Sequence, residues 1–434
     1  MQRKIKARAK NRTPGVTIAA PAKEKRTVSL DKNKLKSKKL RNKIVACCVA
    51  VLALVMTMTP GADGDGDITG KLIAVAMAID YDQGMLKTTV SAALPKPGSS
   101  EGGSVVSVPI SGSGQSVAAC MSDIERKTGK SLETGLCGVV IAGDELAKQG
   151  VNVVLSVLLS SGTVSPGAYF ALADDCDGCE ILKDAASINF DSATILTELM
   201  NGATRNTGAK PVTLLQFVSD SSAKAKSATA PLIKIKKSHG GTGGGEEDSS
   251  GGAEQKSEPC SINRNALFLS GKLVGKLSRE ASLGLSYYDS HTKKGWLVCP
   301  NFIIGNEDVG TLSGEISKVS LTNKTFFSDG VPHSLLTAKI TLKAADRERV
   351  NAVAMRKNLS PDQINTAYKS NFERCVKKAI EKTLSESVAF GCDVFETEQK
   401  LYRFHTKEYK QFVSSGGKVL DECKFEVSAE ITVS

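Results

Sequence analysis

The chain has 434 residues, a net charge of +11 and a hydrophobic fraction of 41%. Residues 1–43 hold 16 Lys or Arg and 2 acidic residues, so the charges of all later residues sum to −3. The length allows two or three domains with cores of their own. Because the excess positive charge lies at the N-terminal end, a basic nucleic-acid-binding groove in the folded part is not supported, and we expect no nucleic-acid partner.

One long apolar run, IVACCVAVLALVMTMT, follows the basic tail and ends at Pro60. As a helix it rises about 24 Å against a bilayer core of about 30 Å, so a single span needs local thinning or snorkelling flanks. Segments rich in Lys and Arg stay on the cytoplasmic side and attract anionic headgroups. The sequence therefore predicts a basic cytoplasmic tail (1–43), a transmembrane anchor (44–60) and an extracytoplasmic body.

Three other interpretations of this run stay open. A signal peptide cleaved after Ala62 places Pro60 three residues before the cut, which is a poor site. A lipoprotein signal at Cys47 is preceded by the charged stretch KKLRNK, where an apolar run is expected. A buried core helix is the third alternative.

Residues 64–238 are predicted to form an α/β domain, because short buried strands alternate with helices. The predicted strands are KLIAVAMAIDYD, GMLKTTVSAAL, SVVSVPI, LCGVVIAG, GAYFALAD and LIKIKK. The first helix, QSVAACMSDIERKTGK, has an apolar face. Asp144 is the predicted N-cap of a second helix, which we expect to continue through Gly150 to the segment LLSSG. ATILTELMNG and VTLLQFVSD are predicted helices, and residues 239–259 are a predicted Gly/Ser-rich linker.

Residues 260–312 are predicted to form a small middle domain that contains a tight turn at Gly271 and a strand with Trp296, the only tryptophan. Residues 313–434 are predicted to form an α+β domain. Alternation in LLTAKITLKA indicates a strand. A long helix follows, with Ser360 as N-cap, Pro361 as first residue and Gly391 at its end. A second helix, EQKLYRFHTKEYKQF, precedes the strand CKFEVSAEITVS, so we expect an antiparallel sheet packed by the long helix.

The cysteine pair Cys176 and Cys179, in DDCDGCE, has CxxC spacing. Free or structural thiols, a local disulfide, and a metal or redox site at a helix start are the open alternatives. No ligand-spaced histidines accompany the pair. Nine of the eleven cysteines follow the apolar run, so at least one of the nine cannot pair internally.

Catalytic and phosphate-binding motifs are missing from the sequence. We find no nucleophile elbow, HExxH motif, paired carboxylates in an apolar setting or glycine-rich phosphate loop. The sequence therefore predicts no catalytic residue, no cofactor and no metal site, and we expect that the protein is not an enzyme.

Several segments, in their order along the chain, resemble the C subunit of spore nutrient-germinant receptors, the Ger(x)C family. The first strand pair and the segment VVIAGDELAKQGVNVVLSVLLSSG are similar to the family's opening, with Asp144 to Lys148 at its GEELAK position. NALFLSGKLVGKLSREASLGL resembles the family's A-x-F…KLVG-x-L…E…G pattern through Ala266, Phe268, Lys272, Leu273, Val274, Gly275, Leu277, Glu280 and Gly284. The long helix, GCDVF, LYRFHTKEYKQF and the final strand follow the family's end.

The resemblance covers residues 64–434 and implies a three-domain mixed α/β body outside the membrane. It implies A- and B-type integral-membrane partners, a small nutrient ligand sensed through the complex, and, in spores, location at the inner membrane. Family members are usually lipoproteins, and this chain has a long basic tail instead. A free-standing membrane-anchored binder of a small ligand or cell-wall fragment, and a thiol-redox enzyme built on Cys176 and Cys179, are the alternatives.

Overall fold

The computed structural model describes residues 70–95, 105–187, 192–235, 260–288 and 294–434, which belong to one unit, Thr69–Ser434. The predicted tail, anchor and linker (1–43, 44–60 and 239–259) lie outside these residues. Within the described part of the chain, no helix combines the length and apolarity that a membrane span requires.

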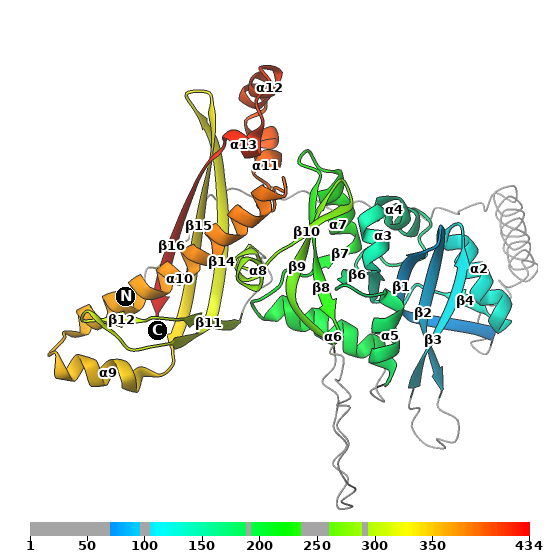
Figure 1. The fold of residues 1–434 in the computed structure, drawn as a ribbon, viewed down its shortest axis with the longest axis horizontal. Helices are drawn as coiled ribbons and strands as arrows, with labels where there is room; N and C mark the ends of the chain where they lie inside the picture. Colours follow the sequence, from blue (N-terminus) through cyan, green and yellow to red (C-terminus); the bar gives the residue numbers. More distant parts are fainter. Residues whose placement is uncertain (1–69, 96–104, 188–191, 236–259, 289–293) are drawn as a thin grey trace, which may run out of the picture. The chain divides into compact units, whose positions relative to one another are not determined.

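The first sheet has ten described strands in the order β10-β9-β8-β6-β5-β1-β2-β3, with β4 beside β1 and β7 beside β6 (Figure 1). Its strands are β1 (Lys71–Asp82), β2 (Met85–Pro95), β3 (Val105–Gly114), β4 (Ser131–Glu133), β5 (Val139–Ala142), β6 (Tyr169–Ala173), β7 (Val212–Thr213), β8 (Ser227–Lys234), β9 (Ser261–Leu269) and β10 (Lys272–Lys276). The central strands β1, β5, β6 and β8 are parallel, and antiparallel strands flank them. This part of the fold is the predicted α/β arrangement.

Helices cover both faces of this sheet, because the short central strands are apolar on both sides. The helices are α2 (Val117–Thr128), α3 (Asp144–Gln149), α4 (Asn152–Ser160), α5 (Gly178–Ser187), α6 (Ser192–Arg205) and α7 (Leu214–Ser222). On one face, α2, α3, α4 and α7 pack against side chains of the sheet such as Met77, Val140 and Phe170 and form one core. On the other face, α5 and α6 pack against side chains of the sheet such as Ala78 and Ile141 and form a second core.

Two expectations about the helix after β5 are wrong. Its N-cap is Gly143, and Asp144 is the first helical residue, with its carboxylate turned to lysines described below. The helix also stops at Gly150, whose φ of 127° is incompatible with a continuing helix, and α4 begins at Asn152. A tertiary contact accompanies the break, because the amide of Val151 donates to the carbonyl of Gly271, 2.9 Å away.

The second sheet has the order β11-β14-β15-β16 among the described strands, and a two-stranded ribbon, β12-β13, adjoins it in sequence. Its strands are β11 (Gly295–Cys299), β14 (Leu312–Ser328), β15 (Val331–Ala344) and β16 (Lys424–Val433), and the ribbon is β12 (Ile303–Ile304) with β13 (Glu307–Asp308). The predicted antiparallel sheet is wrong at one edge, because β16 runs parallel to β15, from His333↔Lys424 to Leu342↔Val433. A helical crossover between two strands permits parallel pairing, and the helices between Ala344 and Lys424 provide it.

The long predicted helix is confirmed as α10 (Pro361–Ala389), about 43 Å long. Ser360 forms a capping box with Gln363, and Gly391 follows the helix with a φ of 69°. The apolar stripe faces the second sheet, where Phe372, Val376 and Ile380 join its core. The helices α8 (Arg279–Ser286) and α9 (Arg347–Arg356) precede α10 in sequence.

The predicted last helix is wrong as a single element. The chain forms α11 (Thr397–Phe404), α12 (Thr406–Ser414) and the short α13 (Val419–Glu422), which share a small core with Phe327 of β14. The break falls at His405, whose Nε2 lies 2.9 Å from the carbonyl oxygen of Thr325 on β14. This tertiary hydrogen bond has no sequence signal.

The residues of the predicted middle domain are divided between the two sheets. β9 pairs with β8 and extends the first sheet, whereas β11 pairs with β14 in the second. α8 packs on α10. Boundaries at 260 and 312 stay a prediction.

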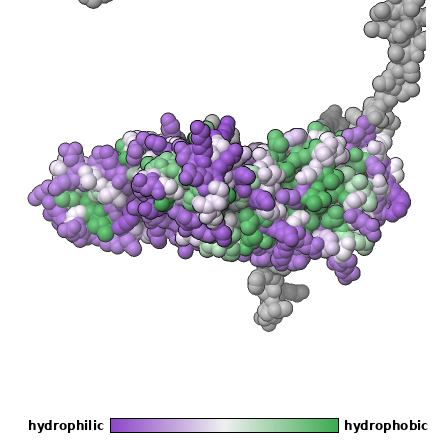
Figure 2. Space-filling view, turned by 90° about the horizontal axis from the view of Figure 1, so that it is seen from above, coloured by the Kyte–Doolittle hydropathy of each residue, from purple (hydrophilic) through white to green (hydrophobic). Residues whose placement is uncertain are grey.

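The surface shown in Figure 2 is mostly hydrophilic, with hydrophobic residues gathered in separate areas. Exposed apolar side chains include Val153 on α4, Leu215 on α7 and Trp296 on the edge strand β11, exposed by 77%, 57% and 58%.

Candidate functional site

Carboxylates lie at the carboxyl ends of three neighbouring parallel strands of the first sheet. Asp80 is near the end of β1, Asp144 follows β5, and Asp174 follows β6. In open α/β sheets this edge is where ligands bind, because polar loops converge there. Sequence reasoning did not single out Asp80 or Asp174, although an acidic residue directly after a buried strand was a usable signal.

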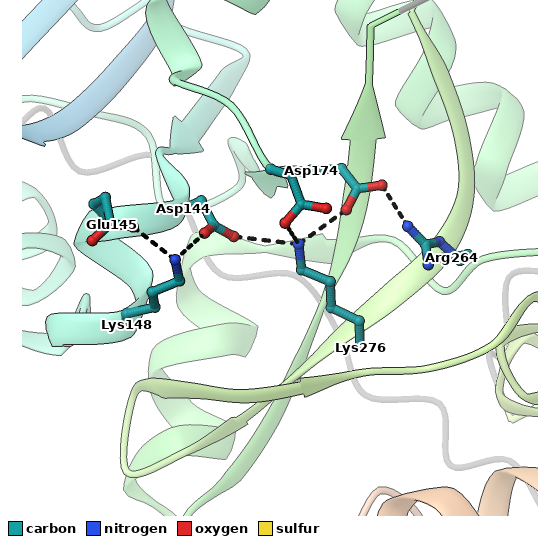
Figure 3. A network of polar contacts seen from close by, with 7 residues as sticks. Asp144, Glu145, Lys148, Asp174, Arg264 and Lys276 are labelled. Atoms are coloured by element: carbon teal, nitrogen blue, oxygen red, sulfur yellow. Dashed lines mark hydrogen bonds and ion pairs between the residues drawn. The ribbon is translucent and has the colours of Figure 1, made fainter.

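Two of these carboxylates belong to a network of seven residues, which we name the carboxyl-edge cluster (Figure 3). Its members are Asp144, Glu145, Lys148, Asp174, Asp175, Arg264 and Lys276. Lys276 of β10 lies at the centre. Its ammonium is 2.6 Å from Asp175, 3.1 Å from Asp174 and 3.3 Å from Asp144.

Further ion pairs complete the cluster. Arg264 of β9 lies 2.6 Å from the second oxygen of Asp174, and Lys148 lies 2.7 Å from both Asp144 and Glu145. Burial acts to lower the pKa of Lys276, but its bonds to Asp175 and Asp174 outweigh burial and raise it. The same lysine lowers the pKa of Asp175. The ion pair with Lys276 therefore favours the charged form of Asp175, which suits a structural contact better than acid–base chemistry.

The cluster brings together two segments that carry the family resemblance. Asp144, Glu145 and Lys148 belong to the DELAK segment, and Lys276 belongs to the KLVGKL segment, more than one hundred residues later. The sequence identified both segments, but it gave no indication that they meet.

The rest of the KLVGKL segment and its following helix form a joint with α10. A Cβ on Gly284 of α8 would collide with the backbone of Ala379, and one on Gly275 of β10 would lie 2.7 Å from the ring of Phe390. The hydroxyl of Thr383 donates to the carbonyl of Ala281 at 2.7 Å. Gly284 thus permits close approach of α8 to α10, and Gly275 permits close approach of β10 to Phe390, the residue that follows α10.

Asp80 holds the CxxC segment in place. Its carboxylate accepts hydrogen bonds from the amides of Gly178, at 2.7 Å, and Cys179, at 3.1 Å, at the start of α5. Burial raises the pKa of Asp80 to about 6 although these two amides lower it. The carboxylate therefore stabilises the N-terminus of α5, where negative charge is favoured.

Cys176 and Cys179 are free thiols in the structure, half-buried and buried respectively, and a disulfide between them stays a prediction. The segment has the expected position, since α5 starts after β6. Its electrostatics oppose thiol activation, because burial and then Glu180 and Asp174 raise the pKa of Cys176 to about 12. A redox site requires the opposite shift. Among the described residues, no cluster of His, Cys, Asp and Glu could hold a metal ion.

A pocket of about 160 Å³, which we name the junction pocket, lies between α7 and β8 on one side and residues 393–399 on the other. Five of its lining residues are charged or amide-bearing: Lys210, Asp220, Asp393, Glu396 and Gln399. Lys210 is only 8% exposed, and among the described residues its ammonium has no ion pair. It lies 5.5 Å from the ring centre of Tyr288.

The carboxylates of the junction pocket are less well compensated than those of the carboxyl-edge cluster. Burial raises the pKa of Asp220 to about 6, and the charge of Lys210 only partly opposes this. Burial also raises the pKa of Asp393 to about 6, against hydrogen bonds from the amides of Thr397 and Glu398. The pocket can accept a small polar molecule, because unpaired buried charges are costly without one.

Two models of spore germination protein domains match the chain, one after the other. A family model described as "Spore germination protein N-terminal domain" matches residues 67–235, and one described as "Spore germination B3/ GerAC like, C-terminal" matches residues 263–434. The solved structure "Crystal Structure of the GerBC protein" is similar over 82% of this chain and 96% of that chain, with 14% identity and a TM-score of 0.48. No curated protein matches the chain.

The two family models together cover most of the chain and lie in the order of the resembling segments. The resemblance predicted from those segments is confirmed, and the chain belongs to the GerAC-like family of spore germination proteins.

Proposed function

We propose that the protein is a non-enzymatic, extracytoplasmic subunit of a membrane germinant-receptor complex that acts in nutrient-triggered spore germination. The observation that carries this proposal is the match of two spore-germination family models, one to each half of the body. In this proposal the basic tail is cytoplasmic, residues 44–60 anchor the chain, and the A- and B-type integral-membrane subunits are its partners. In spores the complex lies in the inner membrane.

The contacts of the motif residues with one another support a non-enzymatic role. An ion pair joins the DELAK and KLVGKL segments, Gly275 packs against Phe390, and Gly284 packs against α10. Residues that bind each other in this way hold parts of a body together. A receptor subunit needs such a rigid body to contact its partners.

The first test is an affinity purification of the full-length protein from detergent-solubilised membranes, with mass spectrometry of the co-purifying proteins. We expect two polytopic membrane proteins in fixed proportion. Deletion of the gene, in a strain freed of redundant receptors, should abolish the germination response to nutrients. Purification of the protein alone, together with an unchanged response, would contradict the proposal.

A second candidate function is a free-standing binding protein for a small polar ligand, and the junction pocket favours it. Lys210 and Asp220 lie in that pocket without a hydrogen bond or ion pair to their charged groups among the described residues. Calorimetric titration of the purified full chain with small charged metabolites tests this function. Binding that is lost in Lys210→Met, by a protein that purifies alone, would favour this second function over the first.

A further inference from the structure

Two cysteines that are far apart in sequence meet between the second sheet and α10. Cys299 is the last residue of β11, and Cys375 lies 76 residues later, in the middle of α10. Their Sγ atoms are 2.6 Å apart. Cys299 is fully buried, and Cys375 is half-buried.

This contact is closer than two separate thiols adopt. Non-bonded carbon atoms rest about 3.5–4.0 Å apart, and sulfur is the larger atom. Core packing alone therefore does not account for the position of the two sulfurs. The two sulfurs need to approach by only about 0.5 Å to reach the length of a disulfide bond, about 2.05 Å.

The surroundings of the pair favour the thiolate form of Cys299. Arg374 is the neighbour of Cys375, and its guanidinium is fixed by the carbonyl of Asn301, at 2.7 Å, and the amide oxygen of Asn371, at 3.0 Å. The hydrogen bond from Cys375 and the guanidinium of Arg374 lower the pKa of Cys299 to about 7, and the same contact, together with burial, raises the pKa of Cys375. By contrast, burial raises the pKa of Cys137 and Cys392 to about 12. The thiolate is the reactive form.

We propose that Cys299 and Cys375 form a disulfide that ties β11 to α10 when the protein meets a small-molecule or protein disulfide as oxidant. Cys375 Sγ, the more accessible sulfur, gives its proton to the Cys299 thiolate 2.6 Å away and attacks one sulfur of the oxidant, which releases the first thiolate. Cys299 Sγ passes that proton to the released thiolate, attacks Cys375 Sγ and displaces the second thiolate, which takes a proton from water. Two electrons pass from the cysteines to the oxidant, which becomes two thiols.

The bond has a structural consequence for β11. Among the described residues this strand pairs only with β14, so it is an edge strand of the second sheet. A disulfide at Cys299 would fix it to the helix that covers the sheet. The inference concerns this chain's own chemistry and does not rest on the proposed function.

The test uses the full-length protein, incubated with oxidised glutathione, alkylated with iodoacetamide and digested without reduction. We expect one cross-linked peptide pair that contains Cys299 and Cys375 and is two hydrogens lighter than the separate peptides. Cys375→Ser should abolish it, and Cys392→Ser, which removes a buried cysteine outside the pair, should leave it unchanged. Alkylation of both Cys299 and Cys375, or their pairing with other cysteines, would overturn the proposal.

Thermal unfolding gives a second, independent readout. Closing a loop of this length lowers the entropy of the unfolded chain, so the oxidised wild type should melt at least about 5 °C above the reduced wild type. Cys375→Ala should show the same melting temperature under both conditions. Equal melting temperatures of the oxidised and reduced wild type would contradict a bond that ties the two elements.

Discussion

The carboxyl-edge cluster lies within the first sheet, whereas the junction pocket lies between that sheet and residues 393–399, and the charged side chains of the two regions are paired to different extents. In the cluster, Lys276 has three carboxylates within 3.3 Å. In the pocket, Lys210, which is more deeply buried than Lys276, has a ring 5.5 Å away and no ion pair among the described residues. Removing one partner from a buried ion pair is strongly destabilising, because it leaves the other charge buried without compensation, and a buried charge that has no partner lowers stability from the start.

This difference in charge pairing indicates different roles for the carboxyl-edge cluster and the junction pocket. The cluster is complete without a ligand, and both of its main segments belong to the pattern that resembles the family. The pocket holds Lys210 and Asp220, whose charged groups have no hydrogen bond or ion pair among the described residues. Substitutions that remove one charge at a time should therefore act with opposite signs in the two regions.

The largest effect is expected for Lys276→Met in the carboxyl-edge cluster. The change leaves Asp144, Asp174 and Asp175 close together without their common cation, so the free energy of unfolding should fall by about 3 kcal/mol. Urea denaturation followed by circular dichroism measures it. The control, Lys148→Met, removes an exposed lysine from the rim of the same cluster and should leave the urea midpoint nearly unchanged.

Gly284→Ala tests the close packing of α8 against α10 without changing any charge. The added methyl group meets the backbone of Ala379 on α10, so a loss of about 1–3 kcal/mol is expected. Gly202→Ala is the matched control, because Gly202 also lies in a helix but has no atom within 4 Å of the added carbon. It should stabilise the protein by about 0.5–1 kcal/mol. Equal effects in the two variants would show that α8 does not approach α10 closely.

The junction pocket should give the protein a pH-dependent stability. Folding raises the pKa of Asp220 from 3.8 to about 6, so the folded state binds more protons than the unfolded state between these values. Stability is therefore lost as the pH rises from about 4 to about 6. Asp220→Asn should gain about 1–2 kcal/mol at pH 7 and little at pH 4. Asp82→Asn, at the exposed end of β1, provides the control in urea titrations at both pH values.

The smallest effect is expected for Lys210→Met in the junction pocket. Methionine keeps the length of the side chain and removes a buried charge without an ion pair. We expect no loss of stability and a gain of up to about 1 kcal/mol, in contrast to Lys276→Met. A loss as large as that of Lys276→Met would mean that Lys210 has a partner after all.

The candidate site could be predicted from the sequence only in pieces. The DELAK and KLVGKL segments were recognisable, but their meeting through Asp144 and Lys276 depends on the order of strands in the first sheet. The junction pocket and the contact between Cys299 and Cys375 had no sequence signal, because each unites residues that are far apart in the chain. Local patterns carry no information about such contacts.

The sequence by itself determined the elements whose cause is local. The alternation of apolar and polar residues predicts β15. Ser360 and Pro361 mark the start of α10, and Gly391 marks its end. The turn at Gly271 predicts the hairpin of β9 and β10. The tertiary structure decided the rest: the parallel pairing of β16, the end of α3 at Gly150 and the break at His405. Periodicity and capping act within a few residues, whereas strand order, strand direction and buried ion pairs arise only when distant segments pack together.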